Sequence, residues 1–330
     1  MQLSEFISMS HHTGKFTGLS DKFDKHLSNL KGYLKKQAAS FESEIRSEAS
    51  DCVKPQGKYL RPLLVFLCAP SRKASDKSLI NRAAVAELIH LASLIHDDVI
   101  DNADLRRSAE TAFKKYGART AILLGDAIFA HAMQMAFSEK DEVVWRRSID
   151  AVKMLCEGEV RQSLAKDKKI DFDKYISIIE QKTASLFEFA CFMGASAECG
   201  SGSDWAKAAQ KAGKHLGTAY QIYDDICDWT QTEKQSGKTA GTDLVFEKHT
   251  LPIILLLEKL PNKQAKILEA NLGKSDSKEL MALMEKYEVG NECKKVYDKQ
   301  LALARKILAK HPKTNAGLLE FCDAMQELLP

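Results

Sequence analysis

Three aspartates in the segment from Ala83 to Arg107 have types and a spacing suited to binding a divalent cation. Asp97, Asp98 and Asp101 follow the apolar run AAVAELIHLASLIH. In a helix, Asp97 and Asp101 would lie within about 40° of each other and Asp98 about 100° round. Carboxylate oxygens one turn apart are ligands that a hard cation such as Mg²⁺ prefers. The segment therefore predicts a helix with a magnesium site at its C-terminal end.

A second acidic cluster, Asp224, Asp225 and Asp228, repeats this spacing within the run QIYDDICD at 221–228. Acidic runs are usually solvated helix ends, but acids near a helix C-terminus oppose the helix dipole and need a compensating cation. Two matched clusters predict one shared metal site, and because Mg²⁺ commonly bridges to phosphates, a phosphorylated substrate. A carboxylate-bridged iron pair would need a Glu-x-x-His motif on each of two helices, and no such pair is visible.

Basic residues occur near both clusters, where a diphosphate would require them. Arginine binds phosphate oxygens bidentately and lysine acts as a point charge. Any one of these residues alone would usually be a solvated surface residue. Lys182 is the exception, because the apolar residues at 178–179 and 186–187 are expected to bury it, and a buried lysine needs a partner. The candidates are Lys58, Arg61, Arg106, Arg107, Lys182, Lys238 and Lys248.

Two further polar residues share a predicted helical face with the aspartates. His90 lies two turns before Asp97, where a hydrogen-bonded core histidine and a substrate contact are equally consistent with the pattern. Gln221 precedes Asp224 by three residues, so its side chain lies on the face of the second cluster. That position favours a contact with the diphosphate or with a metal-bound water.

Apolar residues recur at helical spacing along most of the chain, and no alternating run indicates a strand. A polar, glycine-bearing stretch from Thr230 to Thr250 is predicted to be a mobile flap. No linker divides the chain, so we predict one all-α helical bundle over residues 1–330. The predicted helical segments are Asp21–Ser50, Asn81–Asp101, Arg119–Phe137, Val143–Lys166, Asp173–Gly194 and Asp204–Trp229, followed by amphipathic segments broken at Pro252, Pro261 and Pro312.

The composition is that of a soluble globular protein. The 48 basic and 45 acidic residues leave a net charge of only +3, which gives no indication of nucleic acid or an anionic membrane as a partner. Eight cysteines without a CxxC or finger spacing predict a reducing, cytoplasmic location. The N-terminus lacks a signal-peptide pattern, and the longest aliphatic run, Leu251–Leu257, is too short to span a bilayer. No transmembrane segment is therefore expected.

In the order and spacing of its motifs the chain resembles the trans-type polyprenyl (isoprenyl) diphosphate synthases from about Gly57 to Pro252. The resemblance implies an isoprenoid-synthase bundle with a central active-site cavity, and a homodimer. The matching blocks are GKYLRP at 57–62, ELIHLASLIHDDVIDNADLRR at 87–107, GD at 125–126, GEVRQ at 158–162, KTASLF at 182–187, QIYDDICD at 221–228, GK at 237–238 and TLP at 250–252. The chain departs from the family pattern at Gln56, Ser108, Ala109–Glu110 and Glu247.

The resemblance also implies a role for each matching residue in the condensation of isopentenyl diphosphate with an allylic diphosphate. Mg²⁺, as three ions bound with the allylic diphosphate, would be held by Asp97, Asp101 and Asp224, with Asp98, Asp225 and Asp228 assisting. The same diphosphate would be held by Arg106, Lys182, Gln221, Lys238 and Lys248. Isopentenyl diphosphate would be held by Lys58, Arg61, His90 and Arg107, and the region of Thr183 would shield the allylic cation. Ionisation of the C–O bond would be assisted by a catalytic set of Asp97, Asp98, Asp101, Arg106, Lys182, Asp224 and Lys238.

The residues below the first aspartates predict the length of the product. A growing prenyl chain would meet Ser93 first, about 6 Å along the helix axis from Asp97, with Ala92 beside it. In the family that the chain resembles, small residues at these positions are typical of longer products. We therefore expect a product longer than C20, in the hexaprenyl to octaprenyl range, with Ile89, Phe129 or Met133 as the floor.

Several other functions remain alternatives to this interpretation. A short-chain farnesyl or geranylgeranyl synthase would share the chemistry but stop at C15 or C20. A class I terpene cyclase would not need the second basic site at Lys58, Arg61 and Arg107. A regulatory synthase subunit would not need two complete aspartate clusters. A generic helical protein with acidic surfaces explains neither the matched clusters nor Lys182.

Overall fold

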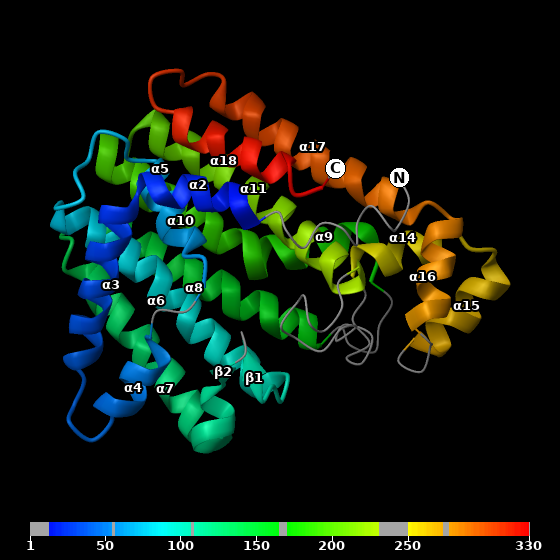
Figure 1. Cartoon of the computed structure of the whole chain (residues 1–330), viewed down its shortest axis with the longest axis horizontal. Helices are drawn as coiled ribbons and strands as arrows, with labels where there is room; N and C mark the ends of the chain where they lie inside the picture. Colours follow the sequence, from blue (N-terminus) through cyan, green and yellow to red (C-terminus); the bar gives the residue numbers. More distant parts are fainter. Residues whose placement is uncertain are drawn as a thin grey trace.

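The structure, a computed structural model, describes residues 13–54, 57–106, 109–164, 170–230, 250–272 and 277–329. Most of these residues are helical and only two two-residue strands are present among them, which confirms the predicted all-α class (Figure 1). The elements are α2 (Thr13–Lys22), α3 (Asp24–Ala39), α4 (Arg46–Cys52), α5 (Leu60–Leu67), α6 (Lys77–Ile100), β1 (Leu105–Arg106), β2 (Ala109–Glu110), α7 (Ala112–Phe137), α8 (Glu142–Ser163), α9 (Phe172–Ile179), the π-helical η2 (Glu180–Ala184), α10 (Ser185–Cys199), α11 (Asp204–Thr230), α14 (Leu251–Lys259), α15 (Asn262–Ala270), α16 (Ser277–Lys286), α17 (Val289–Leu308) and α18 (Ala316–Gln326).

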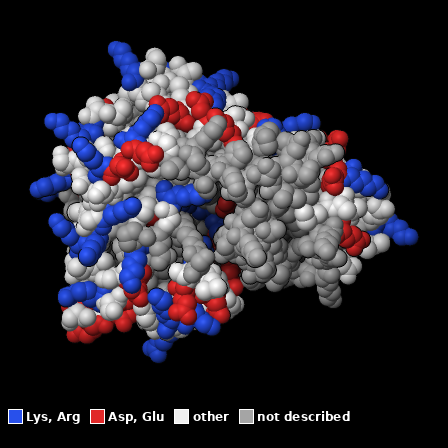
Figure 2. All heavy atoms as spheres, viewed as in Figure 1, with Lys and Arg blue, Asp and Glu red and all other residues white. Residues whose placement is uncertain are grey.

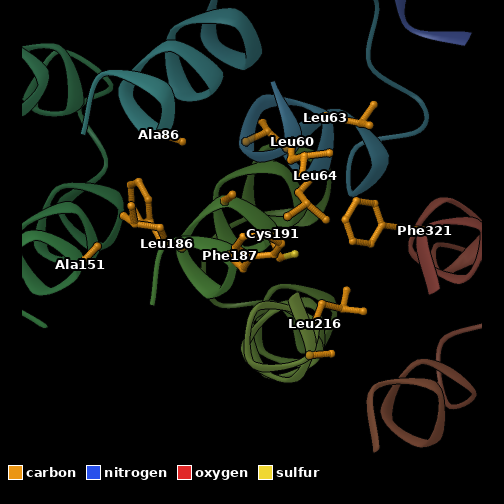
Figure 3. Packing of buried hydrophobic residues seen from close by; sticks show 14 of the residues in the cluster. Leu60, Leu63, Leu64, Ala86, Ala151, Leu186, Phe187, Cys191, Leu216 and Phe321 are labelled. Atoms are coloured by element: carbon orange, nitrogen blue, oxygen red, sulfur yellow. The ribbon is translucent and has the colours of Figure 1, made fainter. Parts of the chain in front are cut away.

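Helix α10 is surrounded by other helices because its sequence is apolar on nearly every side. Every side chain from Ser185 to Ala197 except that of Glu188 is buried. The helix packs against α5, α6, α8 and α11. One continuous cluster of buried apolar residues extends from Phe16 to Leu329. Figure 3 shows the side chains of Leu186, Phe187 and Cys191 among those of Leu60, Leu64, Ala86, Ala151 and Leu216 from these neighbouring helices.

Helix α6 positions the first aspartate cluster. Asp76 caps it by accepting a hydrogen bond from the backbone N–H of Leu79 at 3.0 Å. The helix therefore begins at Lys77. The predicted start was four residues too late, because polar side chains at 77 and 78 interrupt the apolar periodicity on which the prediction rested. It ends at Ile100, as predicted within one residue.

A short antiparallel hairpin, β1–β2, connects α6 to α7. It pairs Leu105 with Glu110 and Arg106 with Ala109. We predicted no strand here, because two-residue strands carry no alternating pattern. The hairpin is functionally relevant because it carries Arg106 back towards the end of α6.

Other predicted boundaries differ from the structure for local reasons. Helix α7 begins at Ala112, not at Arg119, although Gly117 breaks its backbone with φ 79° as expected of a glycine at positive φ. The segment predicted as one helix over Asp21–Ser50 is divided into α3 and α4. The segment predicted over Asp173–Gly194 is continuous but contains the π-helical turn η2. The predicted flap lies outside the described residues from position 231 to 249.

By length and apolar composition alone, α6 and α7 would be long enough to cross a membrane. In α6, 78% of the most apolar window is buried inside the bundle, as in the core helix of a globular protein. In α7 the buried share is 39%. The apolar side chains that α7 leaves exposed include Ile122, Leu123 and Phe137.

The distribution of charged side chains on the surface and the state of the cysteines agree with the composition. Figure 2 shows Lys and Arg side chains intermixed with Asp and Glu on the visible face, without a broad basic patch among the described residues. None of the eight cysteines, all of which lie in described residues, forms a disulfide. Cys68, Cys191, Cys293 and Cys322 are buried.

Candidate active site

The first aspartate cluster lies at the C-terminal end of α6, and its members have different surroundings. Asp97 is partly buried, and Asp101 caps the helix through its backbone N–H, which donates to the Asp97 carbonyl at 2.8 Å. Asp98 is only 4% exposed. Its Oδ1 accepts a 2.7 Å hydrogen bond from Nε of Arg106 on β1. Asp98 therefore anchors the hairpin that carries Arg106, while Asp97 and Asp101 remain at the end of the helix.

Lys182 lies beside this cluster in the π-helical turn η2. Its Nζ is 2.5 Å from Oε2 of Glu159 and donates to Oε1 of Gln162 at 3.0 Å, both on α8. Burial by itself would lower the pKa of Lys182, but the charges of Asp97 and Glu159 raise it above its usual value. The lysine is therefore protonated at neutral pH, and its ammonium group is held between two helices.

The pKa of Asp97 is raised from 3.8 to about 6, mainly because burial disfavours its charged form. The charge of Lys182 opposes this shift, and those of Glu159 and Asp101 add to it. Asp97 is thus a carboxylate that the protein alone stabilises incompletely. A bound cation would supply the missing favourable charge.

The second aspartate cluster, near the C-terminal end of α11, has a matching division between its members. Asp224 is exposed and Asp228 partly exposed, whereas Asp225 is only 5% exposed. Asp225 accepts hydrogen bonds from the hydroxyl of Tyr175 at 2.6 Å and from Nε2 of Gln221 at 2.7 Å. In both clusters, the middle aspartate is thus enclosed by protein groups and the first is more exposed to solvent.

The turn η2 connects the two clusters. The ammonium group of Lys182 interacts electrostatically with Asp97 and Asp101 of the first. The hydroxyl of the next residue, Thr183, donates at 2.6 Å to Oε1 of Gln221, which in turn donates to Asp225 of the second. π-Helical turns interrupt α-helices frequently at functional sites. Here one such turn places neighbouring residues against both acidic helix ends.

The donor set fits Mg²⁺ bound together with a diphosphate. Within the described ranges, no three His, Cys, Asp or Glu side chains are close enough to hold a metal ion by themselves. Mg²⁺ does not require such a cage, because it usually takes one or two carboxylates and completes its shell with waters and phosphate oxygens. Asp97 and Asp101 on one helix and Asp224 on another, with Lys182 beside the first pair, provide the hard oxygen ligands and the cation that this arrangement needs.

The predicted second basic site lies partly within the described residues. Lys58 is exposed, and its charge acts on Cys227 within the second cluster, whose pKa is raised to about 12 mainly by burial. The guanidinium carbon of Arg61 lies 5.4 Å from the centre of the Phe187 ring. His90 is partly buried and lies on the same face of α6 as Asp97. Arg107, Lys238 and Lys248, together with Gln56, Ser108 and Glu247, lie outside the described residues.

The predicted chain-length residues lie deep in α6. Ala92 and Ile89 are fully buried and Ser93 is 6% exposed, with its hydroxyl donating to the His90 carbonyl at 2.8 Å. A pocket of about 70 Å³ borders the neighbouring face of the helix. Its lining includes Leu91, Leu94, Ile95, Asp98 and Arg106 of the α6 end and hairpin, and Asp51, Lys115 and Tyr116 of α4 and α7.

Three residues that contact the predicted site were not predicted as part of it. Glu159 and Gln162 lie in the GEVRQ block, whose two polar side chains three residues apart share a helical face and are the signal that identifies them. Tyr175 had no comparable signal, because its partner Asp225 is 50 residues away in sequence.

A close approach at Gly158 allows α8 to hold Lys182. A Cβ at this position would lie 2.9 Å from Cβ of Gln181 and 2.9 Å from the backbone nitrogen of Lys182. We expect Gly158→Ala to destabilise the protein by about 1–3 kcal/mol, because the backbone of η2 has to move, and to lower activity with it. Thermal unfolding measures the loss. Gly32→Ala is the control, because a Cβ there meets nothing within 4 Å and α3 should gain about 0.5–1 kcal/mol. Equal stability of the two variants would contradict the packing argument.

Comparison with known proteins identifies the family. The profile of the polyprenyl synthetase family matches residues 42–288. An octaprenyl diphosphate synthase from Haemophilus influenzae is 34% identical over 237 residues, which are 70% of this chain and 72% of that protein. A prenyl transferase from Synechocystis is 32% identical over 316 residues, 93% of this chain and 97% of that protein. The crystal structure of a decaprenyl diphosphate synthase from Rhodobacter capsulatus matches with a TM-score of 0.84 and 26% identity over 96% of this chain and 99% of that one. The chain belongs to the polyprenyl synthetase family.

Proposed function

We propose that this protein is a trans-polyprenyl diphosphate synthase, which joins isopentenyl diphosphate head-to-tail to an allylic diphosphate. The observation that carries the proposal is the arrangement around η2, where Lys182 faces one aspartate cluster and Thr183 is hydrogen-bonded to Gln221, which donates to Asp225 of the other. Two acidic helix ends joined through one turn that also carries a lysine suit a metal-bound diphosphate. The relatives named above are octaprenyl and decaprenyl diphosphate synthases, which supports this reaction for the chain.

The reaction requires charge to be stabilised as the allylic C–O bond ionises. We assign Asp97, Asp101 and Asp224 as the Mg²⁺ ligands, and the bound ions would neutralise the diphosphate leaving group. Asp98 assists by holding Arg106, and Asp225 and Asp228 complete the second cluster. Lys182, Arg106 and Gln221 bind diphosphate oxygens, with Lys238 and Lys248 assigned the same role from the sequence. Fixed charges of this kind lower the barrier because they need no reorganisation during ionisation.

The second substrate, isopentenyl diphosphate, is assigned to the cations at the start of α5. Lys58 and Arg61 lie there, and Lys58 is close enough to the second cluster for its charge to act on Cys227. His90 and Arg107 complete this assignment from the sequence. The alkene of this substrate then attacks the allylic cation in the region of Thr183, and the tertiary cation that forms loses a proton to the released diphosphate. Burial of the surrounding helices excludes water, which would otherwise capture the cation.

We also propose that the product is longer than C20. Ser93 and Ala92, below Asp97, are small and leave room for a prenyl chain along α6. Relatives of this chain are named octaprenyl diphosphate synthase, solanesyl diphosphate synthase 1 and heptaprenyl diphosphate synthase component 2, and these names denote products above C20. A farnesyl or geranylgeranyl synthase is the alternative that product sizing tests.

A bulky side chain at Ser93 is expected to shorten the product. Phenylalanine in Ser93→Phe would fill the stripe one turn below Asp97, about 6 Å along the axis, so the chain would stop after fewer additions. Products are sized by chromatography after dephosphorylation. Leu94→Phe is the control, because Leu94 borders the pocket on the neighbouring face. An unchanged product distribution in Ser93→Phe would remove Ser93 from the tunnel.

We propose that the chain is a single domain and forms a homodimer through α7 and α8. Most of the large apolar side chains that the described residues expose belong to these two adjacent helices. A second copy would cover this face, which explains why α7 is apolar without being buried in its own bundle. The exposed residues of the face include Ile122, Leu123, Phe137, Val143, Ile149, Val160 and Leu164. Sedimentation of the purified protein measures the association.

We also propose a cytoplasmic location, supported by the free cysteines.

The decisive experiment incubates the purified protein with Mg²⁺, labelled isopentenyl diphosphate and separate geranyl, farnesyl and geranylgeranyl diphosphate primers. A ladder of products ending above C20 is expected. Products that stop at C15 or C20 would keep the chemistry and overturn the length. Hydrocarbon or alcohol from the primer alone would indicate a terpene cyclase, and inactivity with every primer would indicate a regulatory subunit.

A further inference from the structure

Asp225 is the most enclosed member of the second cluster, and both of its carboxylate oxygens accept hydrogen bonds from the protein. Oδ2 accepts from the Tyr175 hydroxyl at 2.6 Å and Oδ1 from Nε2 of Gln221 at 2.7 Å. Tyr175 is 4% exposed and Asp225 5% exposed. Hydrogen bonds to an ionised carboxylate are stronger than those between neutral groups. They therefore fix the orientation of the Asp225 side chain.

The hydrogen bonds extend from Asp225 to the turn that carries Lys182. Gln221 donates to Asp225 through Nε2 and accepts from the hydroxyl of Thr183 through Oε1. The chain of contacts runs Tyr175, Asp225, Gln221, Thr183, and so joins α9, α11 and η2. In the proposed reaction, Tyr175 contacts neither a substrate nor a metal ion.

This arrangement determines how the exposed Asp224 is presented. Asp224 precedes Asp225, so in α11 the two side chains point about 100° apart. Fixing Asp225 inward against α9 fixes the rotation of this part of α11, and with it the outward direction of Asp224. Groups behind the metal ligands commonly contribute ten- to a hundredfold in metal affinity, because they hold the ligands in place.

We infer that Tyr175 is a positioning residue that preorganises the second aspartate cluster for Mg²⁺ and diphosphate by holding Asp225 through its hydroxyl. The inference rests on the proposed function for the identity of the bound group. It concerns a residue that touches neither substrate nor metal, so its effect should appear in binding and in the Mg²⁺ requirement more than in the folded structure.

The test uses the full chain with Tyr175→Phe, which removes only the hydroxyl. Calorimetric titration with Mg²⁺ and inorganic diphosphate should show binding weakened on the order of tenfold. In the prenyl-transfer assay, the Mg²⁺ concentration for half-maximal rate should rise by a similar factor, while KM for isopentenyl diphosphate stays unchanged. Thr183→Val interrupts the same chain of hydrogen bonds at its other end and is expected to weaken binding in the same direction.

Tyr297→Phe is the matched control. Tyr297 is a fully buried tyrosine of α17 whose hydroxyl donates to the Met325 carbonyl of α18, so the variant also loses one buried hydrogen bond, but not one made to an aspartate of the cluster. It should unfold at a lower temperature without a change in binding of Mg²⁺ and diphosphate. Wild-type binding in both Tyr175→Phe and Thr183→Val, or an equal loss in Tyr297→Phe, would overturn the inference. Wild-type protein without prenyl transfer would overturn the proposed function instead, since that result concerns the unaltered chain.

Discussion

Asp97→Asn should lower the rate of prenyl transfer by about a thousandfold and at the same time stabilise the metal-free protein. The loss of rate follows from removing a charged metal ligand at the leaving group, where one electrostatic contact contributes about 10²–10³. The gain in stability follows from burial, which raises the pKa of Asp97 to about 6 and makes its ionised form unfavourable in the folded state. Asparagine keeps the shape of the side chain and removes the charge.

The direction of the pH effect follows from that raised pKa. Protonated Asp97 stabilises the fold fully below its unfolded value of 3.8, and this contribution is lost as the pH rises through about 6. Wild-type protein should therefore lose stability over this range, whereas Asp97→Asn should not. At pH 7.5 we expect the variant to be more stable by about 1–2 kcal/mol, discounted because Asp97 is partly exposed to solvent.

Chemical denaturation with a chelator present, at pH 4 and pH 7.5, measures this difference. Asp104→Asn is the control, because Asp104 follows the same helix end, is exposed, and forms an ion pair with the exposed Lys114 at 2.9 Å. It should change neither the rate nor the pH dependence. A stability gain in Asp97→Asn that is equal at both pH values would contradict the assignment to a buried charge.

Lys182→Met should reduce prenyl transfer by about 10²–10³-fold, because it removes the cation beside Asp97 and Asp101 of the first aspartate cluster. The variant should also be less stable. Glu159 would lose the ammonium group 2.5 Å away and remain as a partly buried carboxylate. In the wild-type pair, the side chain of Lys182 is 26% exposed and that of Glu159 is 20% exposed. Removing one partner of such a pair costs about 1–3 kcal/mol, less than for a fully buried pair.

A double variant separates the two effects. Lys182→Met with Glu159→Gln removes the unpaired charge, so most of the stability should return while the rate stays low. Lys214→Met serves as the control for losing a lysine that pairs with a glutamate at η2, because Lys214 lies 2.8 Å from Glu180 of this turn but is assigned no contact with substrate or metal. Recovery of the rate in the double variant would show that Lys182 acts only by balancing Glu159.

The sequence alone determined the features that depend on local spacing. Helical periodicity indicated the α-helices, and the positions of Asp97, Asp101 and Asp224 on their faces required no tertiary information, because residues three and four apart always share a helical face. The apolar neighbours of Lys182 predicted its burial in the same way. Two-residue strands and the π-helical turn were missed, because neither produces a periodic pattern long enough to recognise.

Only the tertiary structure distinguished between residues that the motifs present as equivalent. Asp98 and Asp97 are neighbours in sequence, yet Asp98 is bound by Arg106 from a hairpin, and Asp225 is bound by Tyr175 from a helix 50 residues earlier. Lys182 likewise finds Glu159 and Gln162 on a separate helix, at a distance that Gly158 permits. These partners come from elements that folding brings together, so the difference between enclosed and more exposed aspartates depends on tertiary packing and not on the spacing within either motif.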